Sequence, residues 1–415
     1  MANNTSSVQL IQGAVQQYAW GKVGKSSKVA LLCANADLSF SLKDDEPYAE
    51  LWMGAHPKAP SKLIGGDKNL LDFVKEYPGV LGEKVVSQFG VLPFLFKVLS
   101  VAKSLSIQAH PDKALAEKLH VERPEVYRDS NHKPEMAIAL TEFEALCGFR
   151  PVKEIVQFLE AVPELEAVVG KVTADRLKAK CLNGVSDVAS SLKECFSNVI
   201  LSEKHIREEC LNTLVQRIEK MKEDNLNLEP VHGELLLRVH SQFPGDVGCF
   251  VIYFLNHILL SSGEAIFLGA NVPHAYLSGD CIECMACSDN VVRAGLTPKL
   301  VDASTLCDML EYLPTPAEDR KFQPKSSDYP FELVYDPPVK DFAVICIRVP
   351  SDHEKYAVKQ HDSASILLCI SGTASVAGIA GELKPGVVAF IPANVLMEIF
   401  PQGSEILLYR ATCIL

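Results

Sequence analysis

The sequence predicts a mainly β protein that carries an α-helical insertion, and three observations support this fold class. Short apolar runs punctuated by Gly and Pro fill two stretches, at 8–150 and 341–415. Between them, at 151–245, apolar side chains recur at helical spacing. The length of 415 residues leaves room for more than one domain, since a domain usually takes about 100–200 residues.

The first stretch, 8–150, is expected to be mainly β. Strands are predicted at 91–99, 104–110 and 134–140, where apolar residues run between turn signals. Helices are expected around 70–90 and 113–121.

The middle stretch, 151–245, changes to a helical pattern. Val152, Ile155, Val156, Leu159 and Val162 repeat at helical spacing, with Lys, Glu and Asp between them. This predicts several amphipathic helices, and the charge run at 219–224 is interpreted as a solvated helix face.

The last part of the chain returns to strands. The apolar run 249–260 is predicted to be a buried core helix, and 263–270 has a strand–turn pattern. Residues 313–340, rich in Pro, Lys and Asp, are predicted to form a connecting loop segment. Strands are expected at 342–349, 365–370, 387–391 and 405–411, which is typical of a sandwich or jelly-roll barrel.

These patterns predict a division into three domains. The first is a discontinuous barrel made of 1–150 and 246–312. The second is an inserted helical domain at 151–245, and the third is the connecting segment with a C-terminal barrel at 313–415.

Composition narrows the possible partners. The net charge is −12 and argues against binding to nucleic acid or an anionic membrane, because both need a basic surface. No uncharged apolar stretch of about 18 residues is present, and residues 1–7 lack the apolar core of a signal peptide. The 13 cysteines mostly stand singly in apolar runs, which predicts free thiols and a cytoplasmic protein. We also expect a monomer.

The first chemical motif is a strand with one polar face. Ser106, Gln108 and His110 alternate with apolar residues, so their side chains point the same way. If that face meets water, this is an ordinary outer strand. If it faces the inside of a barrel, a His nitrogen and an amide oxygen can share a metal ion.

Glu135 and His274 are two further candidate ligands. Pro134 favours an extended backbone before it, so Glu135 opens an apolar strand. Its carboxylate lies either at the mouth of the sheet or beside a metal ion that compensates its charge. His274, in a turn-to-strand context beside Tyr276, is either a structural histidine or a ligand.

Taken together, these residues form a plausible zinc set. Gln108, His110, Glu135 and His274 offer two nitrogen and two oxygen donors, which suits a borderline cation such as zinc. A single carboxylate leaves such a site with a net charge of about +1, which favours Lewis acid chemistry.

The segment 280–299 is dense in charges. Glu283, Asp289, Arg293 and Lys299 lie there among turn residues, and the two cations could hold a phosphate or a sugar oxyanion. The alternative is surface ion pairing.

The same segment carries Cys281, Cys284 and Cys287 at regular spacing. An iron–sulfur cluster usually needs a fourth nearby Cys, but the next one here is Cys307. We therefore expect buried thiols rather than a cluster.

Seven segments together resemble the type I mannose-6-phosphate isomerases. They are 18–21 (YAWG), 49–57 (AELWMGAHP), 95–99 (LFKVL), 105–113 (LSIQAHPDK), 132–135 (HKPE), 271–276 (NVPHAY) and 283–299. They occur in order along most of the chain, and the helical insertion fits the plan of that family. One departure is Cys287, where the family often has another small residue.

The resemblance implies a fold and an activity. The fold would be two cupin-type jelly-roll β-barrel modules with a helical domain inserted. The activity would be the reversible conversion of mannose 6-phosphate to fructose 6-phosphate with one zinc ion per chain, supplying mannose 6-phosphate for GDP-mannose. The C-terminal module has Leu396 and Met397 where a metal-binding cupin places a His, so we expect a degenerate barrel without metal.

The resemblance also assigns roles to residues. The zinc ligands of the family fall on Gln108, His110, Glu135 and His274, and its catalytic arginine falls on Arg293. The phosphate-binding residues fall on Ser106, Lys299 and Lys133, and Trp20 and Tyr276 are assigned to the substrate. Glu283 and Asp289 match acidic residues of the pocket.

The sequence leaves the proton carrier open among Glu283, Lys133 and Asp289, because each is chemically able to move a proton. Two other functions also stay open at this point. They are a non-catalytic sugar-binding cupin and a different zinc-dependent cupin enzyme.

Overall fold

Most of the β structure lies in two large sheets. The computed structural model describes residues 5–184, 187–379 and 381–415. The first sheet follows the order β15-β12-β9-β13-β7-β5-β2, and β8, β10, β11 and β14 branch from it. Its strands are β2 (Ala14–Gln16), β5 (Glu50–Met53), β7 (Phe94–Val101), β8 (Ile107–Ala109), β9 (Glu135–Ala139), β10 (Phe143–Phe149), β11 (Leu255–Leu260), β12 (Ala265–Leu268), β13 (His274–Ala286), β14 (Val292–Gly295) and β15 (Lys321–Phe322).

The second sheet joins the two ends of the chain. Its order is β16-β17-β18-β25-β20-β23-β1-β6, so two strands from the first part of the chain complete a C-terminal sheet. Its strands are β1 (Gln9–Gln12), β6 (Lys62–Leu63), β16 (Lys325–Ser326), β17 (Glu332–Tyr335), β18 (Ala343–Val349), β20 (Ser365–Ser371), β23 (Val388–Ile391) and β25 (Ile406–Thr412). Two small sheets contain β19 (Tyr356–Val358), β21 (Ala374–Val376), β22 (Glu382–Leu383) and β24 (Met397–Pro401), and β3 (Lys22–Val23) with β4 (Pro47–Tyr48).

The helices form one large group and several single elements. The group is α5 (Val152–Ala161), α6 (Pro163–Val169), α7 (Lys171–Leu182), α8 (Ala189–Ile200), α9 (Lys204–Glu223), α10 (Gly233–Gln242) and the short α11 (Gly248–Val251). The others are α1 (Lys28–Ala36), α2 (Leu70–Glu76), α3 (Glu83–Gln88), α4 (Lys113–Glu122) and α12 (Ala303–Met309), with 3-10 turns η1 (Gly24–Ser26), η2 (Pro78–Leu81), η3 (Glu229–Val231) and η4 (Ala317–Arg320). No helix within the described ranges has the length and apolar character needed to cross a membrane.

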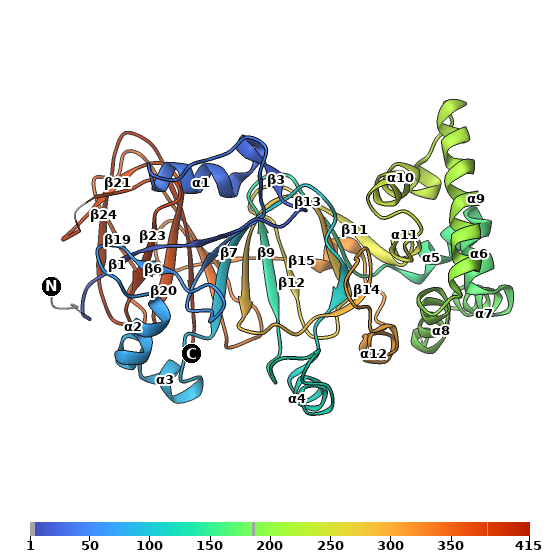
Figure 1. Ribbon diagram of the computed structural model, residues 1–415, viewed down its shortest axis with the longest axis horizontal. Helices are drawn as coiled ribbons and strands as arrows, with labels where there is room; N and C mark the ends of the chain where they lie inside the picture. Colours follow the sequence, from blue (N-terminus) through green and yellow to red (C-terminus); the bar gives the residue numbers. More distant parts are fainter. Residues whose placement is uncertain (1–4, 185–186, 380) are drawn as a thin grey trace.

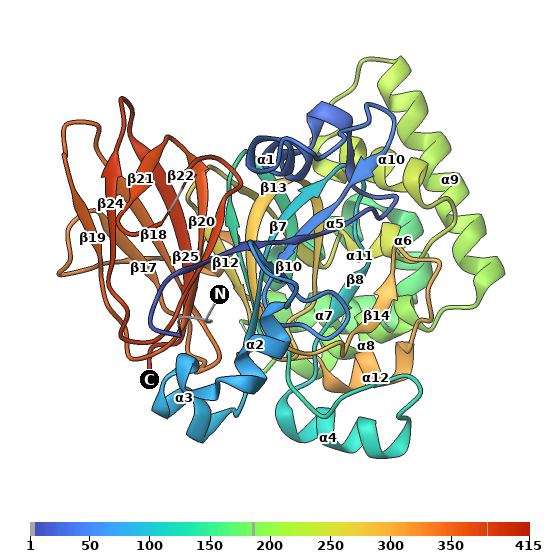
Figure 2. The same cartoon turned by 60° about the vertical axis from the view of Figure 1, so that its left-hand side comes forward.

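The three parts lie in a row. Figure 1 shows the C-terminal strands at one end, the first sheet in the middle and the helical group at the other end. Figure 2 shows the same order from a second angle, with β1 reaching across toward the C-terminal strands. The predicted class, mainly β with a helical insertion, is confirmed. The residue boundaries of the predicted domains stay a prediction.

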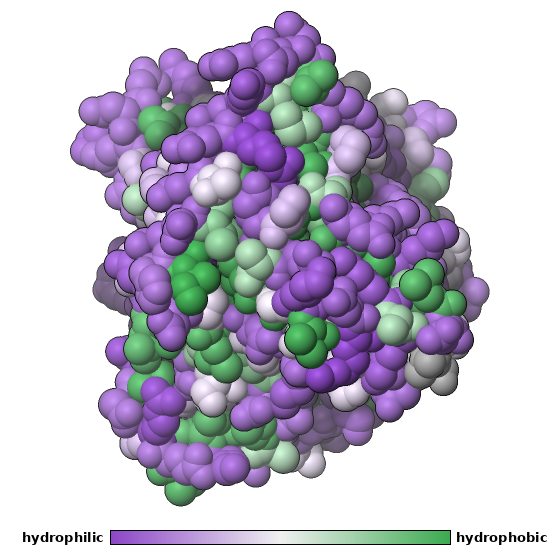
Figure 3. Space-filling view, turned by 90° about the vertical axis from the view of Figure 1, so that its right-hand side faces the viewer, coloured by the Kyte–Doolittle hydropathy of each residue, from purple (hydrophilic) through white to green (hydrophobic). Residues whose placement is uncertain are grey.

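The helical pattern of 151–245 matches the structure in detail. Ile155, Val156, Leu159 and Val162 are buried in one core with the apolar faces of α8 and α9. The charge run at the end of α9 is exposed, apart from half-buried Met221. Figure 3 shows that the face of the molecule at the helical end is largely hydrophilic, with small apolar patches.

Two local predictions are wrong. Residues 249–260 do not form a core helix, because only α11 is helical there and Leu255–Leu260 forms β11, which pairs with β10. A short apolar run fits a buried strand as well as a buried helix, so its pattern could not separate them. The predicted connecting segment 313–340 contains η4 and the strands β15, β16 and β17.

Strand alternation separates two apolar faces of the first sheet. Phe94, Phe96 and Val98 of β7 pack in a core shared with β18, β20, β23 and β25. Leu99 and Val101 of the same strand point the other way, into the interior formed by β9, β10, β11 and β13. The first sheet is thus covered by the second sheet on one side and encloses its own interior on the other.

A buried carboxylate links the helical group to the first sheet. Glu144 on β10 accepts hydrogen bonds from His257 Nε2 at 2.6 Å and Ser278 Oγ at 2.9 Å, and it pairs with Arg238 of α10. Burial opposes ionisation of Glu144, but the hydrogen bonds from His257 and Arg238 outweigh it and lower its pKa to about 2.

We expect Glu144→Gln to remove a stabilisation that depends on pH. The folded pKa of Glu144 lies below its unfolded value, so its contribution is fully present above pH 4.5 and is lost as the pH falls toward about 2. At neutral pH the variant should be less stable by about 3 kcal/mol. Chemical denaturation at a series of pH values measures this. The exposed neighbour Glu142→Gln is the control, and equal pH profiles for the two variants would contradict the expectation.

Candidate active site

A cleft of about 950 Å³ is lined by strands of the first sheet and by the segments next to them. Ten of the twelve residues singled out from the sequence line it: Trp20, Ser106, Gln108, Lys133, Glu135, Tyr276, Glu283, Asp289, Arg293 and Lys299. The other two, His110 and His274, are buried beside Glu135. The structure therefore brings together residues that lie up to about 280 positions apart in the sequence.

Two histidines have their ring nitrogens fixed by the backbone. His110 Nδ1 lies 2.8 Å from the carbonyl oxygen of Asn290, and His274 Nδ1 lies 2.9 Å from that of Val272. A carbonyl oxygen only accepts, so each Nδ1 carries the proton and each Nε2 keeps its lone pair. Both Nε2 atoms therefore have the form that binds a metal ion.

Glu135 completes a buried group of three ligands. Its oxygens lie 3.4 Å from His110 Nε2 and 3.5 Å from His274 Nε2. One ligand atom from each of the three residues lies within 4.8 Å of the others. His110 Nε2 and Glu135 Oε2 are buried without a hydrogen-bond partner in the described part of the chain. Because buried polar atoms normally have partners, this donor set fits a bound cation.

Charge at this group is set by its neighbours. Burial opposes ionisation of Glu135, but positive charge beside it, above all that of Lys133, whose Nζ lies 3.2 Å away, outweighs burial and holds the pKa of Glu135 well below its usual range. Burial lowers the pKa of His110 to about 4, so this imidazole is neutral at neutral pH. An ionised carboxylate and a neutral imidazole are the states that bind metal.

Gln108 lies at the junction of three strands. It is opposite His274 of β13 and opposite Arg293 of β14, so all three side chains share one face. Its Nε2 lies 3.5 Å from His274 Nε2, and its Oε1 accepts a hydrogen bond of 3.4 Å from Ser106. A half-turn of the amide would direct the oxygen toward the histidines, which is the atom a metal ion needs.

A buried ion-pair network lies next to the ligand group, and the sequence analysis gave no role to its lysine. Lys97 Nζ lies 2.8 Å from Glu283 and 3.6 Å from Glu50, and all three side chains are buried. Desolvation opposes the charge of Lys97, but the two carboxylates outweigh it and raise its pKa. Burial raises the pKa of Glu283. A single Lys in the apolar strand at 94–101 is the signal that could have identified this network.

Arg293 and Lys299 differ from the other charged residues of the cleft. Among the described residues, neither has a carboxylate within 4.0 Å. Burial lowers the pKa of both, and the neighbouring charge of Arg293 lowers that of Lys299 further. Two adjacent cations without counter-ions form a site for an anion.

The remaining predicted residues line the walls of the cleft. Asp289 pairs with Lys58 at 2.8 Å, so the predicted acid has its own cation. The Tyr276 hydroxyl is buried with no hydrogen-bond partner in the described part of the structure, and burial raises its pKa. Trp20 stacks on Tyr18 with ring centroids 5.8 Å apart.

A second group that the sequence did not reveal holds the loop beside His110. The Asp129 carboxylate accepts hydrogen bonds from the Asp289 backbone N–H and from Ser288 Oγ, both at 2.8 Å. The Asn290 side chain donates to the backbone carbonyl of Asp129 at 2.7 Å. Asn290 in turn supplies the carbonyl oxygen that orients His110. Asp129 precedes these residues by about 160 positions, so no local pattern could show the contact.

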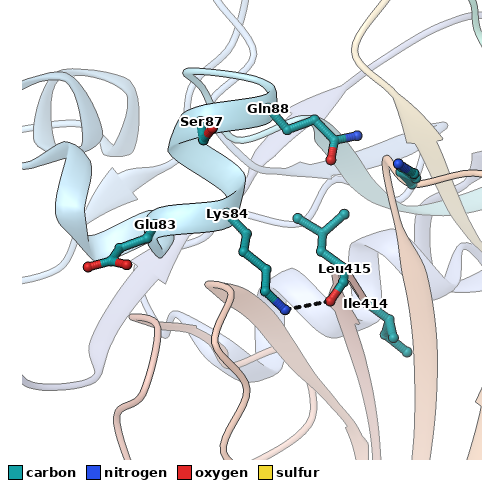
Figure 4. Close-up of a pocket in the computed structure, with 7 residues that line it drawn as sticks. Glu83, Lys84, Ser87, Gln88, Ile414 and Leu415 are labelled. Carbon is teal, nitrogen blue, oxygen red and sulfur yellow. Dashed lines mark hydrogen bonds between the residues drawn. The ribbon is translucent and has the colours of Figure 1, made fainter.

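A second groove shares no lining residue with this cleft. Figure 4 shows it between α3 and the C-terminus, where Lys84 Nζ donates to the Leu415 oxygen at 2.7 Å. It contains none of the residues predicted for the site.

Comparison with known families identifies three consecutive parts. The description "Phosphomannose isomerase type I, catalytic domain" matches residues 8–152. The helical insertion domain of the same family matches 168–255, and its C-terminal domain matches 333–378.

Individual relatives and solved structures agree with this result. The chain is 54% identical to the mannose-6-phosphate isomerase of Rattus norvegicus and 52% identical to that of Homo sapiens, with 97% of each chain covered in both comparisons. It is similar to a crystal structure of mannose 6-phosphate isomerase bound with zinc and yttrium, with a TM-score of 0.83 and 34% identity. That match covers 99% of this chain and 100% of the other.

We expect Asp129→Asn to weaken metal binding at His110, Glu135 and His274. The variant loses one acceptor for the loop that orients His110, and changes of this kind usually cost about 10–100-fold in metal affinity. Competition with a chromogenic chelator measures the affinity for zinc. Asp302→Asn is the matched control, because Asp302 accepts from Tyr127 and Arg123 but contacts no candidate ligand. An equal loss in both variants, or none in either, would contradict the expectation.

Proposed function

This chain belongs to the type I phosphomannose isomerase family, and from that premise we propose that it interconverts mannose 6-phosphate and fructose 6-phosphate. The observation that carries the proposal is the buried group of His110, Glu135 and His274 beside two cations without counter-ions, Arg293 and Lys299. The first group fits a metal ion, and the second fits a phosphate. A phosphorylated sugar is a substrate that can use both.

We propose that one zinc ion per chain is held by Gln108, His110, Glu135 and His274. Two imidazole nitrogens, a carboxylate and an amide oxygen suit zinc in a site that the whole fold assembles. When bound, zinc would supply Lewis acid stabilisation for negative charge on the sugar oxygens. The solved relative that contains zinc supports this choice of metal.

Arg293, Lys299 and Ser106 are the proposed residues for the phosphate end of the substrate. Arg293 and Ser106 lie on or beside the strands that carry Gln108, so phosphate binding fixes the distance from that end to the ligand group. This binding energy orients the reacting carbons although the phosphate itself does not react. Trp20 and Tyr276 line the cleft and are the residues proposed to contact the sugar.

The isomerisation needs a group that moves a proton between adjacent carbons. The base takes the proton from C2 of the open-chain aldose, the electron pair forms the C1–C2 double bond, and O1 gains a proton. The enediol(ate) then loses the O2 proton and receives a proton at C1, which gives the ketose. Burial raises the pKa of Glu283 even though it pairs with Lys97, whereas Lys58 lowers the pKa of Asp289, and this difference supports Glu283 as the carrier. Lys133, which pairs with Glu135, is the third candidate. The family resemblance offers a different role for Arg293, in which it would stabilise the anionic intermediate and assist ring opening; this is the alternative to its proposed role at the phosphate.

Two finer assignments belong to the same proposal. Each β module is of the cupin type, and the C-terminal one is degenerate. Its interior is packed with aliphatic side chains, and Met397 is buried within it while Leu396 is half exposed. The biological role is the supply of mannose 6-phosphate for GDP-mannose in the cytoplasm, and the 13 free cysteines support a reducing compartment.

We expect activity to disappear when the metal is removed and to return when zinc is added. A coupled assay on mannose 6-phosphate that follows fructose 6-phosphate measures this before and after chelation, with metal analysis of the same sample. The proposal requires turnover to follow zinc content. A folded, zinc-loaded protein without turnover would instead favour a sugar-binding cupin or another zinc enzyme.

We expect Lys299→Gln to raise KM for mannose 6-phosphate by about 10–100-fold, because a hydrogen bond to a charged group contributes about 1.5–3 kcal/mol. The value of kcat should change much less, since the lost contact is to the phosphate. The control is unphosphorylated mannose at high concentration, on which the variant and the wild type should behave alike. A similar loss on both sugars would show that Lys299 does not act through the phosphate.

A further inference from the structure

The link between the last two helices of the helical group is hydrogen-bonded to the cationic side of the cleft. Asp246 lies between α10 and α11, and its Oδ1 accepts from the backbone N–H of Gly248 and of Leu296, both at 2.7 Å. Leu296 directly follows β14 and is 50 positions away in the sequence. One carboxylate oxygen therefore ties the end of the insertion to the turn after β14.

That turn has a strained backbone. Leu296 has a φ of +53° and is buried, although a side chain with a Cβ disfavours this region. At Gly295, an added Cβ would lie 2.7 Å from Asp246 Oδ1 and 2.8 Å from Gly248 N, so only glycine fits there. Strain of this kind persists only where the surrounding structure holds it. Here Asp246 and the core around Leu296 hold it.

The strained turn separates the two cations of the cleft. Arg293 lies three residues before Leu296 and Lys299 three residues after it, and all three line the cleft. The two positive charges repel each other, and no carboxylate of the described chain lies within 4.0 Å of either. Their closeness is therefore imposed by the backbone between them rather than by an ion pair.

A second contact runs from the same helix end to the other wall. Gln242 is the last residue of α10, and its Oε1 accepts from the Ser104 backbone N–H at 2.8 Å. Ser104 leads into the segment that carries Ser106 and Gln108. Gln242 and Phe243 also line the cleft, so the helical group forms part of its wall.

We propose that Asp246 is a positioning residue that sets the spacing of Arg293 and Lys299 for the phosphate of the substrate, and that this is one task of the helical insertion. The proposal deepens the proposed function, since it concerns the same anion site. Asp246 holds the turn through two backbone hydrogen bonds and does not itself contact the phosphate. Without it, the left-handed conformation of Leu296 loses its polar partner, and the two cations separate.

The test compares Asp246→Ala and Asp246→Asn with Asp37→Ala. Asp37 is a matched control, because its carboxylate also accepts two hydrogen bonds within a turn, from Ser39 N at 2.8 Å and Ser39 Oγ at 2.6 Å, but it does not line the cleft. Calorimetric titration of the zinc-loaded protein with inorganic phosphate measures anion affinity. Titration with zinc measures the metal site, and isomerase kinetics give kcat and KM.

We expect Asp246→Ala to weaken phosphate binding about tenfold or more and to raise KM for mannose 6-phosphate by a similar factor. Zinc affinity should stay within about twofold of the wild type, because none of the ligands moves. Asp246→Asn keeps an oxygen acceptor and should restore phosphate affinity to within about threefold. If the alanine variant does not fold, Asp246→Ser replaces it in the test and should show the same loss of phosphate affinity. The shorter serine hydroxyl cannot reach the backbone N–H groups of both Gly248 and Leu296.

Unchanged phosphate affinity in Asp246→Ala would overturn the proposal, and so would an equal change in Asp37→Ala. A loss of zinc and phosphate affinity together would also overturn it, since that indicates general disruption of the fold. A wild-type protein without isomerase activity would end the proposed function instead. The phosphate titration would still decide the role of Asp246.

Discussion

The site depends on one constraint, the burial of several charged groups inside the first sheet. Glu135 is almost fully buried, and the lone pairs of two imidazoles face it. An ionised carboxylate in such a place is costly unless positive charge lies beside it. Lys133 supplies one charge at 3.2 Å, and the donor set fits a second one from a metal ion. The neighbouring pair of Lys97 and Glu283 solves the same problem with protein groups alone. Buried charge is thus balanced in two ways in this interior. Lys97 and Glu283 balance each other, whereas Glu135 and its two histidines form a donor set that fits a metal ion.

The rest of the fold keeps these charges in register and away from water. Lys97 and Glu283 are directly opposite each other on β7 and β13, and Glu135 lies on the other neighbour of β13. The outer face of these strands is covered by the second sheet, whose strands share a core with Phe94, Phe96 and Val98. This explains why strands from both ends of the chain complete the C-terminal sheet. β1 and β6 complete the layer that covers this face of the first sheet.

Much of the secondary structure could be predicted because it follows from patterns within short segments of the sequence. The strand at 134–140 appears as β9, and alternation along 104–110 placed Ser106 and Gln108 on one side. The prediction of a helix over 249–260 was wrong because an apolar run carries no period, and only the pairing of β11 with β10 decides it. Asp129 and Asp246 could not be found, since their partners lie about 160 and 50 positions away and an isolated Asp looks like any turn residue. Lys97 was visible in the sequence, but its partner Glu283 became apparent only through strand register.

The arrangement of charge explains how one cleft can treat the two ends of a substrate differently. At one wall, Glu50, Glu135 and Glu283 bring three negative charges against the two positive charges of Lys97 and Lys133, so no positive charge is left there to attract a phosphate. At the other wall, Arg293 and Lys299 are not matched, and they attract one. A phosphorylated sugar that enters in reverse would bring its dianion against buried carboxylates, which is strongly unfavourable. The orientation of the substrate in the cleft therefore follows from which charged side chains have counter-ions and which do not. The residues that position Arg293 and Lys299 are then as important for specificity as these two cations themselves.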